Sequence, residues 1–176
     1  EAIEVKDGVI DTLEMMADQA LLEMYEMDPK GRFGVNQSGH VIPIDQISKM
    51  PIRINQPLEP EFFSYCDEVI YKNLITYCSH YPDALPSCWW SAGGHVAVYK
   101  RGALLGPHSD NDVNYHYGDH PKDQTALFNV VSSSAVLGAG FNGGNLKFEY
   151  LDIETRVGPG DHILFPANYM ATHSIT

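Results

Sequence analysis

The stretch His95-Val96-Ala97-Val98-Tyr99 decides the fold class, because the chain changes from helical to strand-like patterns at this point. The stretch has the alternation that is typical of a half-buried β-strand. Before it, apolar residues recur at three- and four-residue steps over residues 8–27 and again from Pro60 to Tyr81, which predicts two amphipathic helices. After it, no helical period survives.

Short apolar segments separated by glycine-rich turns follow this stretch. The turn signals are Phe141-Asn142-Gly143-Gly144 and Gly158-Pro159-Gly160. Residues 32–56, which Pro43 and Pro51 interrupt, predict a loop with one or two short edge strands. Helices first and many short strands afterwards favour an α+β protein whose β part is a sandwich or jelly roll, with the helices packed on one sheet. The expected strands are residues 95–99, 126–131, 145–150, 153–157, 161–165 and 171–175.

Composition narrows the class of protein. The 176 residues are 44% hydrophobic, which is sufficient for one domain with its own core. Lys and Arg total 11 against 23 Asp and Glu, a net charge of -12, so neither nucleic acid nor an anionic membrane surface is an expected partner. The chain lacks a basic secretory start and any apolar run of about 20 residues, so a cytoplasmic location is expected.

His108 and Asp110, with His173 far downstream, form the main candidate site. Positions i and i+2 of a strand point to the same face, so His108 and Asp110 could reach one ion. Two histidines and one carboxylate are the ligands of non-haem Fe(II) centres, which keep open positions on the metal. The tripeptide His108-Ser109-Asp110 also arises by chance, so an ordinary polar strand end is the alternative interpretation.

The order of the elements around these residues resembles the catalytic core of prolyl-4-hydroxylase-type Fe(II)/2-oxoglutarate-dependent dioxygenases. The resemblance covers roughly residues 99–176. It implies a double-stranded β-helix, a jelly-roll or cupin-like fold, with N-terminal supporting helices. We therefore expect one domain over residues 1–176, with helical support over about residues 1–90 and the jelly-roll core over about residues 91–176. The matching motifs are Tyr99, Gly106-Pro107-His108-Ser109-Asp110, Thr125, Gly143-Gly144-Asn145-Leu146-Lys147-Phe148, Val157-Gly158-Pro159-Gly160-Asp161 with Leu164-Phe165, and His173.

The resemblance also implies a site and an activity. His108, Asp110 and His173 would be the iron ligands, and Tyr99 would contact the cosubstrate 2-oxoglutarate, although an aromatic residue on a strand is more often part of the core. The expected enzyme uses Fe(II), 2-oxoglutarate and O2 to hydroxylate an unactivated C–H, with succinate and CO2 as co-products. Asp110, in place of a Gly or Ala that would leave room for halide, favours hydroxylation over halogenation, whereas desaturation, ring formation and epimerisation use the same ligands and stay open as alternatives. The expected substrate is a small molecule such as an amino acid or a biosynthetic intermediate.

A basic partner for the distal carboxylate of 2-oxoglutarate is missing from the expected place. The family has an Arg or Lys on the strand after the last histidine, but this sequence ends at Thr176 and does not begin with Met. A buried carboxylate needs a cation. We therefore expect that the sequence is a fragment without its C-terminal strand, or that another basic residue substitutes, or that 2-oxoglutarate is not used. The possible substitutes are Lys100, Arg101, Lys147 and Arg156.

Three other functions and two further features stay open at this stage. The chain could be a prolyl or peptidyl hydroxylase that acts on a protein, a cupin-like metal protein that does not use 2-oxoglutarate, or a non-enzymatic β-sandwich binding module. Residues 111–124, with His116 and His120, are expected to form a lid over the metal or an ordinary solvated loop. Trp89-Trp90 is expected to line a pocket or to pack in the core.

Overall fold

The computed structural model describes residues 1–25, 31–37, 39–55, 60–88, 91, 94–110 and 129–176. The expected lid at residues 111–124, with His116 and His120, and the pair Trp89-Trp90 lie outside the described residues. The chain combines helices with several antiparallel sheets, which confirms the α+β class.

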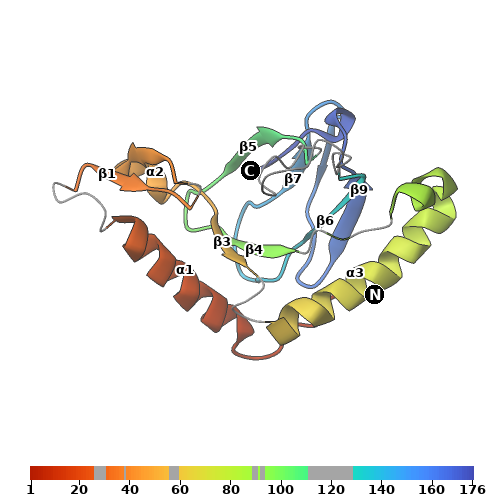
Figure 1. Cartoon of the computed structure of the whole chain (residues 1–176), viewed down its shortest axis with the longest axis horizontal. Helices are drawn as coiled ribbons and strands as arrows, with labels where there is room; N and C mark the ends of the chain where they lie inside the picture. The colour runs from red at the N-terminus through yellow and green to blue at the C-terminus, as the bar shows by residue number, and fades with distance from the viewer. Residues whose placement is uncertain (26–30, 38, 56–59, 89–90, 92–93, 111–128) are drawn as a thin grey trace, which may run out of the picture.

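The two predicted helices are confirmed. Helix α1 spans Val9–Tyr25 and helix α3 spans Pro60–His80. Pro60 suits the first turn of α3, where its missing N–H needs no partner, and Pro82 cannot continue the helix. The two helices form the arms of a V along one side of the molecule, with most strands between the arms (Figure 1). The shorter helical segments are α2 (Ile44–Ile47), η2 (Pro82–Ser87) and η3 (Tyr169–Ala171).

The described strands pair only in the antiparallel sense. The largest sheet has four strands in the order β5-β10-β7-β8, so β10, the last described strand, lies between two earlier ones. The pairs β1-β2, β3-β4 and β6-β9 form three two-stranded sheets. The bounds are β1 Phe33–Val35, β2 Val41–Pro43, β3 Ile52–Asn55, β4 His95–Val98, β5 Leu105–His108, β6 Val131–Ala135, β7 Leu146–Phe148, β8 Ile153–Thr155, β9 His162–Pro166 and β10 His173–Ile175.

Two apolar cores lie in different parts of the molecule. The large core joins the helices to the β3-β4 pair, and its least exposed members are Leu13, Ala17, Ile47, Ile52 and Val69. The small core lies around the β5-β10-β7-β8 sheet and strand β9. Its buried residues are Leu146, Phe148, Phe165 and Ala171, with Ile163 and Ile175 packed against them.

Two strand predictions need correction. The strand expected at residues 126–131 is instead β6 at Val131–Ala135, and residues 126–128 lie outside the described residues. Ser132, Ser133 and Ser134 are poor strand formers, but the full register with β9 places them in the sheet. Residues 32–56 hold three strands and α2, not only a loop with one or two edge strands, because Ile52 and Ile54 of β3 are buried in the large core.

The other expected strands are found with shorter bounds. Strand β4 matches the stretch 95–99, and β7, β8, β9 and β10 lie within the four later segments or extend one residue beyond them. Among the described helices, none has both the length and the apolar character needed to span a lipid bilayer.

Candidate metal centre

His108 and His173 face each other across two neighbouring strands. The register of β5 and β10 pairs His173 directly with His108. Side chains of directly opposed residues in an antiparallel pair lie on the same face of the sheet. The two imidazole rings are accordingly close, with 4.4 Å between their centroids. The pairing of β5 with β10 thus brings together two residues that are far apart in sequence.

Asp110 completes the cluster from just beyond the strand. It lies in the bend that follows β5, and not in the strand itself as the i, i+2 argument assumed. One carboxylate oxygen, Oδ1, is 3.5 Å from His108 Nε2, and the other, Oδ2, is 3.9 Å from His173 Nε2. One potential ligand atom from each of the three residues lies within 4.8 Å of the others. The structure therefore brings all three predicted ligands together.

Both histidines are oriented by the same type of contact, in which the ring Nδ1 lies beside the carbonyl oxygen of the residue two positions earlier. The Nδ1 atom of His108 lies 3.0 Å from the carbonyl oxygen of Gly106, and that of His173 lies 3.0 Å from the carbonyl oxygen of Ala171. A carbonyl accepts only, so these contacts select the tautomer with the proton on Nδ1. The lone pair of each Nε2 is then turned toward the cluster, as it must be to bind a metal.

The electrostatics of the cluster keep a carboxylate available for a cation. Partial burial opposes ionisation of Asp110, but side-chain interactions with His108 and Ser132 and the fields of the two histidines outweigh it and lower the pKa of Asp110. The interaction of His108 with Asp110 raises the pKa of His108, although desolvation and the charge of Arg53 act in the opposite direction. A bound cation would replace the proton that this arrangement favours.

Strand β6 and the residues before it support the carboxylate. The side chain of Asn129 donates a hydrogen bond of 2.9 Å to the main-chain oxygen of Asp110. Ser132 interacts with the carboxylate and helps to lower its pKa. No local pattern singles out Ser132, because only the position of β6 beside the site brings its hydroxyl to Asp110.

His173 is embedded in the small core. Its side chain is only 7% exposed. Its ring centroid lies 4.8 Å from that of Phe165 and 5.9 Å from that of Phe148. The next residue, Ser174, points the other way and donates a hydrogen bond of 2.7 Å to Glu149 Oε1. The packing of two aromatic rings against His173 leaves this ligand little freedom to turn.

Tyr99 lies just beyond β4 and is half-buried, and no described contact joins it to the three ligands. Burial raises the pKa of its phenol, and the nearby charge of Arg53 acts in the opposite direction. Two residues that the sequence did not single out belong to the same neighbourhood, Arg53 of β3 and His95 of β4. Desolvation, followed by the charge of Arg53, lowers the pKa of His95, whereas Asp110 opposes this shift.

The four possible substitutes for the missing basic residue have other roles in the structure. Lys100 pairs with Asp18 of α1 at 2.7 Å, and Arg101 is exposed in the turn after β4. Lys147 pairs with Glu149 at 3.0 Å, on the opposite sheet face from its buried neighbours Leu146 and Phe148.

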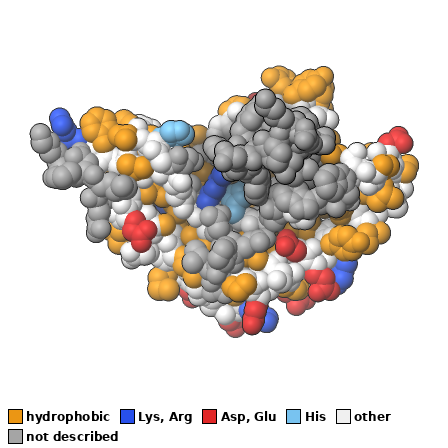
Figure 2. Space-filling view, in the orientation of Figure 1, with side chains coloured by type: hydrophobic (Ala, Val, Ile, Leu, Met, Phe, Trp, Pro, Cys, Tyr) orange, Lys and Arg blue, Asp and Glu red, His pale blue; other side chains and the backbone are white. Residues whose placement is uncertain are grey.

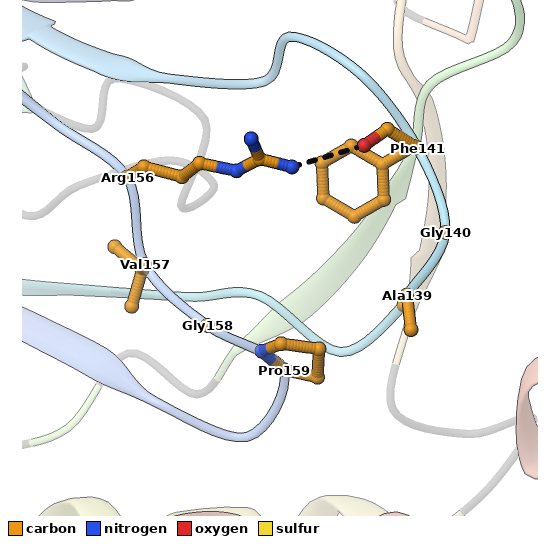
Figure 3. A pocket seen from close by; sticks show the side chains of 8 residues that line it. Ala139, Gly140, Phe141, Arg156, Val157, Gly158 and Pro159 are labelled. Atoms are coloured by element: carbon orange, nitrogen blue, oxygen red, sulfur yellow. Dashed lines mark hydrogen bonds between the residues drawn. The ribbon is translucent and has the colours of Figure 1, made fainter.

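Arg156 lies in a separate cavity of about 250 Å³, where its guanidinium donates a hydrogen bond of 3.1 Å to the carbonyl of Phe141. Figure 3 shows Arg156 reaching across this cavity between the glycine-rich turns 138–141 and 156–159. None of the three candidate metal ligands lines the cavity.

Comparison of the chain with protein-family models, with curated proteins and with solved structures found no match.

Proposed function

We propose that the chain is an Fe(II)- and 2-oxoglutarate-dependent oxygenase of the prolyl-4-hydroxylase type, which hydroxylates an unactivated C–H of a small molecule. The observation that carries the proposal is the facing pair His108 and His173, with both Nε2 atoms directed at Asp110 and both Nδ1 atoms bound to carbonyls. Two rings that present the same nitrogen to the carboxylate have the orientation that a metal site would need, and this match supports the proposal.

The donor set fits iron better than the harder or softer biological cations. Calcium and magnesium prefer six or more oxygen ligands, and structural zinc is usually held by four protein ligands that include thiolates. Two imidazoles and one carboxylate on one side of an ion match the set that holds non-haem Fe(II) and leaves coordination positions for other ligands. The three cysteines are free, and none belongs to the cluster.

The strand order supports a double-stranded β-helix for the β part. In the order β5-β10-β7-β8, a late strand is inserted between earlier ones, so the connections must cross from one sheet to another. Jelly rolls are built from such long-range antiparallel pairings. The β6-β9 pair, whose Ser132 reaches Asp110, would then form part of the wall facing the four-stranded sheet.

In the proposed reaction, Fe(II) would be held by His108, Asp110 and His173 and would supply the oxidising chemistry with O2 and 2-oxoglutarate, which leaves as succinate and CO2. The chain's own contribution is positioning. The carbonyls of Gly106 and Ala171 fix the two imidazoles, and Ser132 and Asn129 fix Asp110. Phe148 and Phe165 pack beside His173 and keep water away from that side of the site.

The charge of the chain bears on the substrate class. A net charge of -12 disfavours a nucleic-acid substrate, because the protein repels polyanions. We propose a small molecule as the substrate, with a prolyl residue of a protein as the alternative.

Anaerobic titration of the purified chain with Fe(II) and then with 2-oxoglutarate tests the proposal. We expect the weak visible charge-transfer band of the iron chelate, and succinate after air is admitted. His108→Ala should abolish metal binding and the band. His80→Ala makes the same change at the exposed end of α3 and should leave both intact.

Three results would contradict the proposal in different ways. Fe(II) binding and O2 consumption without succinate would favour a cupin-like metal protein. A metal content that His108→Ala does not change would favour a binding module without a metal centre. Succinate formed only in the presence of a protein or peptide would favour a peptidyl hydroxylase.

A further inference from the structure

A cavity of about 250 Å³ lies between two loops of the β part, at residues 138–141 and 156–159. The first loop joins β6 to β7, and the second joins β8 to β9. The N–H of Gly160 donates to the carbonyl of Val136 at 2.7 Å, and the N–H of Val136 donates to the carbonyl of Asp161 at 3.2 Å. These two backbone hydrogen bonds hold the loops together beside the cavity.

The cavity and the candidate metal ligands lie toward opposite ends of the four-stranded sheet. At one end, the register pairs Phe148 with His173. At the other end, Leu146 is paired with Thr155, and Arg156 follows directly. None of the three candidate ligands lines the cavity, so what the cavity binds does not rest on the proposed function.

Arg156 provides the only charged side chain among the described residues that line the cavity. Its guanidinium reaches from one loop to the other, where one N–H donates to the carbonyl of Phe141 at 3.1 Å (Figure 3). No carboxylate lies within 4.0 Å of this guanidinium in the part of the chain that the structure describes. A guanidinium has five N–H donors, so most of them remain for a ligand.

Main-chain N–H groups are a second source of donors around the cavity. The N–H groups of residues 138–141, and those of Val157 and Gly158, make no hydrogen bond to another described residue. All of these residues line the cavity. Gly140 has φ +76°, a left-handed conformation that glycine adopts without strain. Successive N–H groups in such turns form concave sites that bind anions.

The rest of the lining is apolar. The ring of Phe141 packs against Gly144, where an added Cβ would lie only 2.9 Å from Cε2 of the ring. Glycine at this position therefore lets the ring pack closely. Val157 and Pro159 line the cavity from the other loop (Figure 3). A ligand with a small apolar group beside its anionic group would bury that apolar group against these side chains.

The arrangement of donors favours a phosphate over a carboxylate. The planar fork of an arginine already satisfies both oxygens of a carboxylate. A phosphate group has at least three strong acceptor oxygens, so it can use the guanidinium and the main-chain N–H groups together.

The size of the cavity and the surface charge favour a small ligand. A volume of about 250 Å³ is below the range of roughly 300–1,000 Å³ that is typical of sites for drug-sized molecules. On the face shown in Figure 2, the described basic side chains lie singly and form no patch. A nucleic acid would need several cations along its backbone, so it does not fit this surface.

We propose that the cavity binds the phosphate group of a small molecule, with the guanidinium of Arg156 and the N–H groups of residues 138–141 as donors. Phe141, Val157 and Pro159 contact the organic part of the ligand, if it has one. The phosphate belongs to a monoester or is inorganic phosphate, and both sources carry the same anionic group.

Titration of the full chain without added metal, followed by two-dimensional amide NMR at constant ionic strength, tests the proposal. The probes are inorganic phosphate and phenyl phosphate. Both should bind and should shift the amide signals of residues 138–141 and 156–158 most. Arg156→Gln should weaken binding by about tenfold to a hundredfold, the loss expected for hydrogen bonds to a charged group. Arg156→Lys should retain part of the affinity, because it keeps the charge but loses the planar fork.

Arg101→Gln is the matched control, because it removes the same charge from an exposed position in the turn after β4. It should leave both affinities unchanged. Failure of the wild-type protein to bind either probe, or phosphate affinity that Arg156→Gln does not alter, would overturn the proposal. Benzoate that binds as tightly as phenyl phosphate, with the same dependence on Arg156, would overturn the assignment to phosphate.

Phe141→Leu separates the two sources of phosphate. If phenyl phosphate binds the wild type more tightly than inorganic phosphate does, and Phe141→Leu reduces this difference, the ligand is a phosphate ester. If the two probes bind the wild type equally well, the ligand is inorganic phosphate. Amide signals that stay unchanged away from the two loops show that each variant is folded.

Discussion

The large core and the small core differ in their number of buried residues and in their distance from the candidate metal centre. Among the described residues the large core has ten buried members and the small core four. Full burial of a Leu, Ile or Val side chain contributes about 1.5–3 kcal/mol, so most of the apolar stabilisation comes from the large core. The small core instead surrounds a metal-ligand candidate, His173. Most of the apolar stabilisation and the candidate metal centre therefore lie in two different regions, and we expect a change in the large core to leave the candidate centre intact.

The largest expected effect is on the small core's histidine. His173→Ala should lower the affinity for Fe(II) or for Mn(II) by more than about 100-fold, because loss of a ligand exceeds the 10–100-fold that loss of a ligand's hydrogen-bond partner costs. Isothermal titration calorimetry measures this affinity. A cooperative urea transition shows whether the variant is folded. Metal affinity that persists in a folded variant would mean that His173 is not a ligand.

A cavity in the large core should lower the stability of the protein without lowering its metal affinity. Leu13→Ala should lower the free energy of unfolding by about 2–5 kcal/mol and leave the metal affinity of the folded protein unchanged. Leu13 is 2% exposed, and Met15, two residues along the same helix, is 65% exposed. Met15→Ala should therefore change stability by less than about 0.5 kcal/mol. A parallel loss of metal affinity in Leu13→Ala would show that the two regions are coupled.

A change of shape in the small core should affect both properties moderately. Phe165→Leu removes the ring that lies 4.8 Å from His173, and we expect about a tenfold loss of metal affinity. The free energy of unfolding should fall by about 0.5–1.5 kcal/mol. Phe63→Leu makes the same change at a 5% exposed position on α3 and should lower stability without a change in metal affinity. Equal metal affinities in the two variants would argue that the aromatic packing does not orient His173.

The smallest expected effect lies at the junction between the two regions. His162 of β9 contacts Asn73 of α3 through Nε2 at 3.1 Å, and its buried Nδ1 has no hydrogen-bond partner among the described residues. Desolvation and the N-terminal amino group lower its pKa, while Asp161 opposes them. The unfolded chain therefore takes up a proton at a higher pH than the folded one.

The stability contributed by neutral His162 is thus complete above the unfolded pKa of about 6.5 and is lost as the pH falls below it. Urea unfolding of the metal-free protein on both sides of that pH measures the loss. His162→Gln, whose amide oxygen can still accept from Asn73, should show a flatter dependence on pH. His80→Gln, at an exposed position, should behave as the wild type does. His95, whose pKa is also lowered, contributes a slope in the same direction, and His108, whose pKa is raised, contributes a slope in the opposite direction.

Local signals in the sequence were sufficient for the helices and for the closeness of His108 and Asp110 in the candidate site. The three- and four-residue apolar steps and the prolines at positions 60 and 82 predicted α1 and α3 almost to the residue. His108 and Asp110 are neighbours in sequence, so their proximity needed no knowledge of the fold. His173 was found through the order of motifs, and the β5-β10 register now gives the physical reason for its position. The double-stranded β-helix and the use of iron stay predictions.

The remaining residues of the candidate site could not be predicted from the sequence, because their neighbours depend on contacts between distant strands. Ile52-Arg53-Ile54 alternates as a strand does, but the prolines nearby favoured a loop interpretation, and only the pairing with β4 shows that this segment is a strand. His95 and Ser132 could not be predicted as part of the site either. Each comes close to Asp110 only through the positions of β4 and β6 in the fold. The four basic residues considered as substitutes were chosen by type, and their ion pairs and hydrogen bonds depend on contacts with other elements.

The position of β10 between β5 and β7 also sets an order of events during synthesis. His108 and Asp110 leave the ribosome well before His173, and for that interval the nascent chain has only two of the three ligands. A chain that folds as a unit cannot complete the four-stranded sheet until β10 has emerged. In the proposed iron centre, all three ligands are therefore available only after β10 has been made. A shorter nascent chain with two of the ligands would hold redox-active iron loosely and would risk oxidising its own side chains, and the strand order of the proposed centre reduces that hazard.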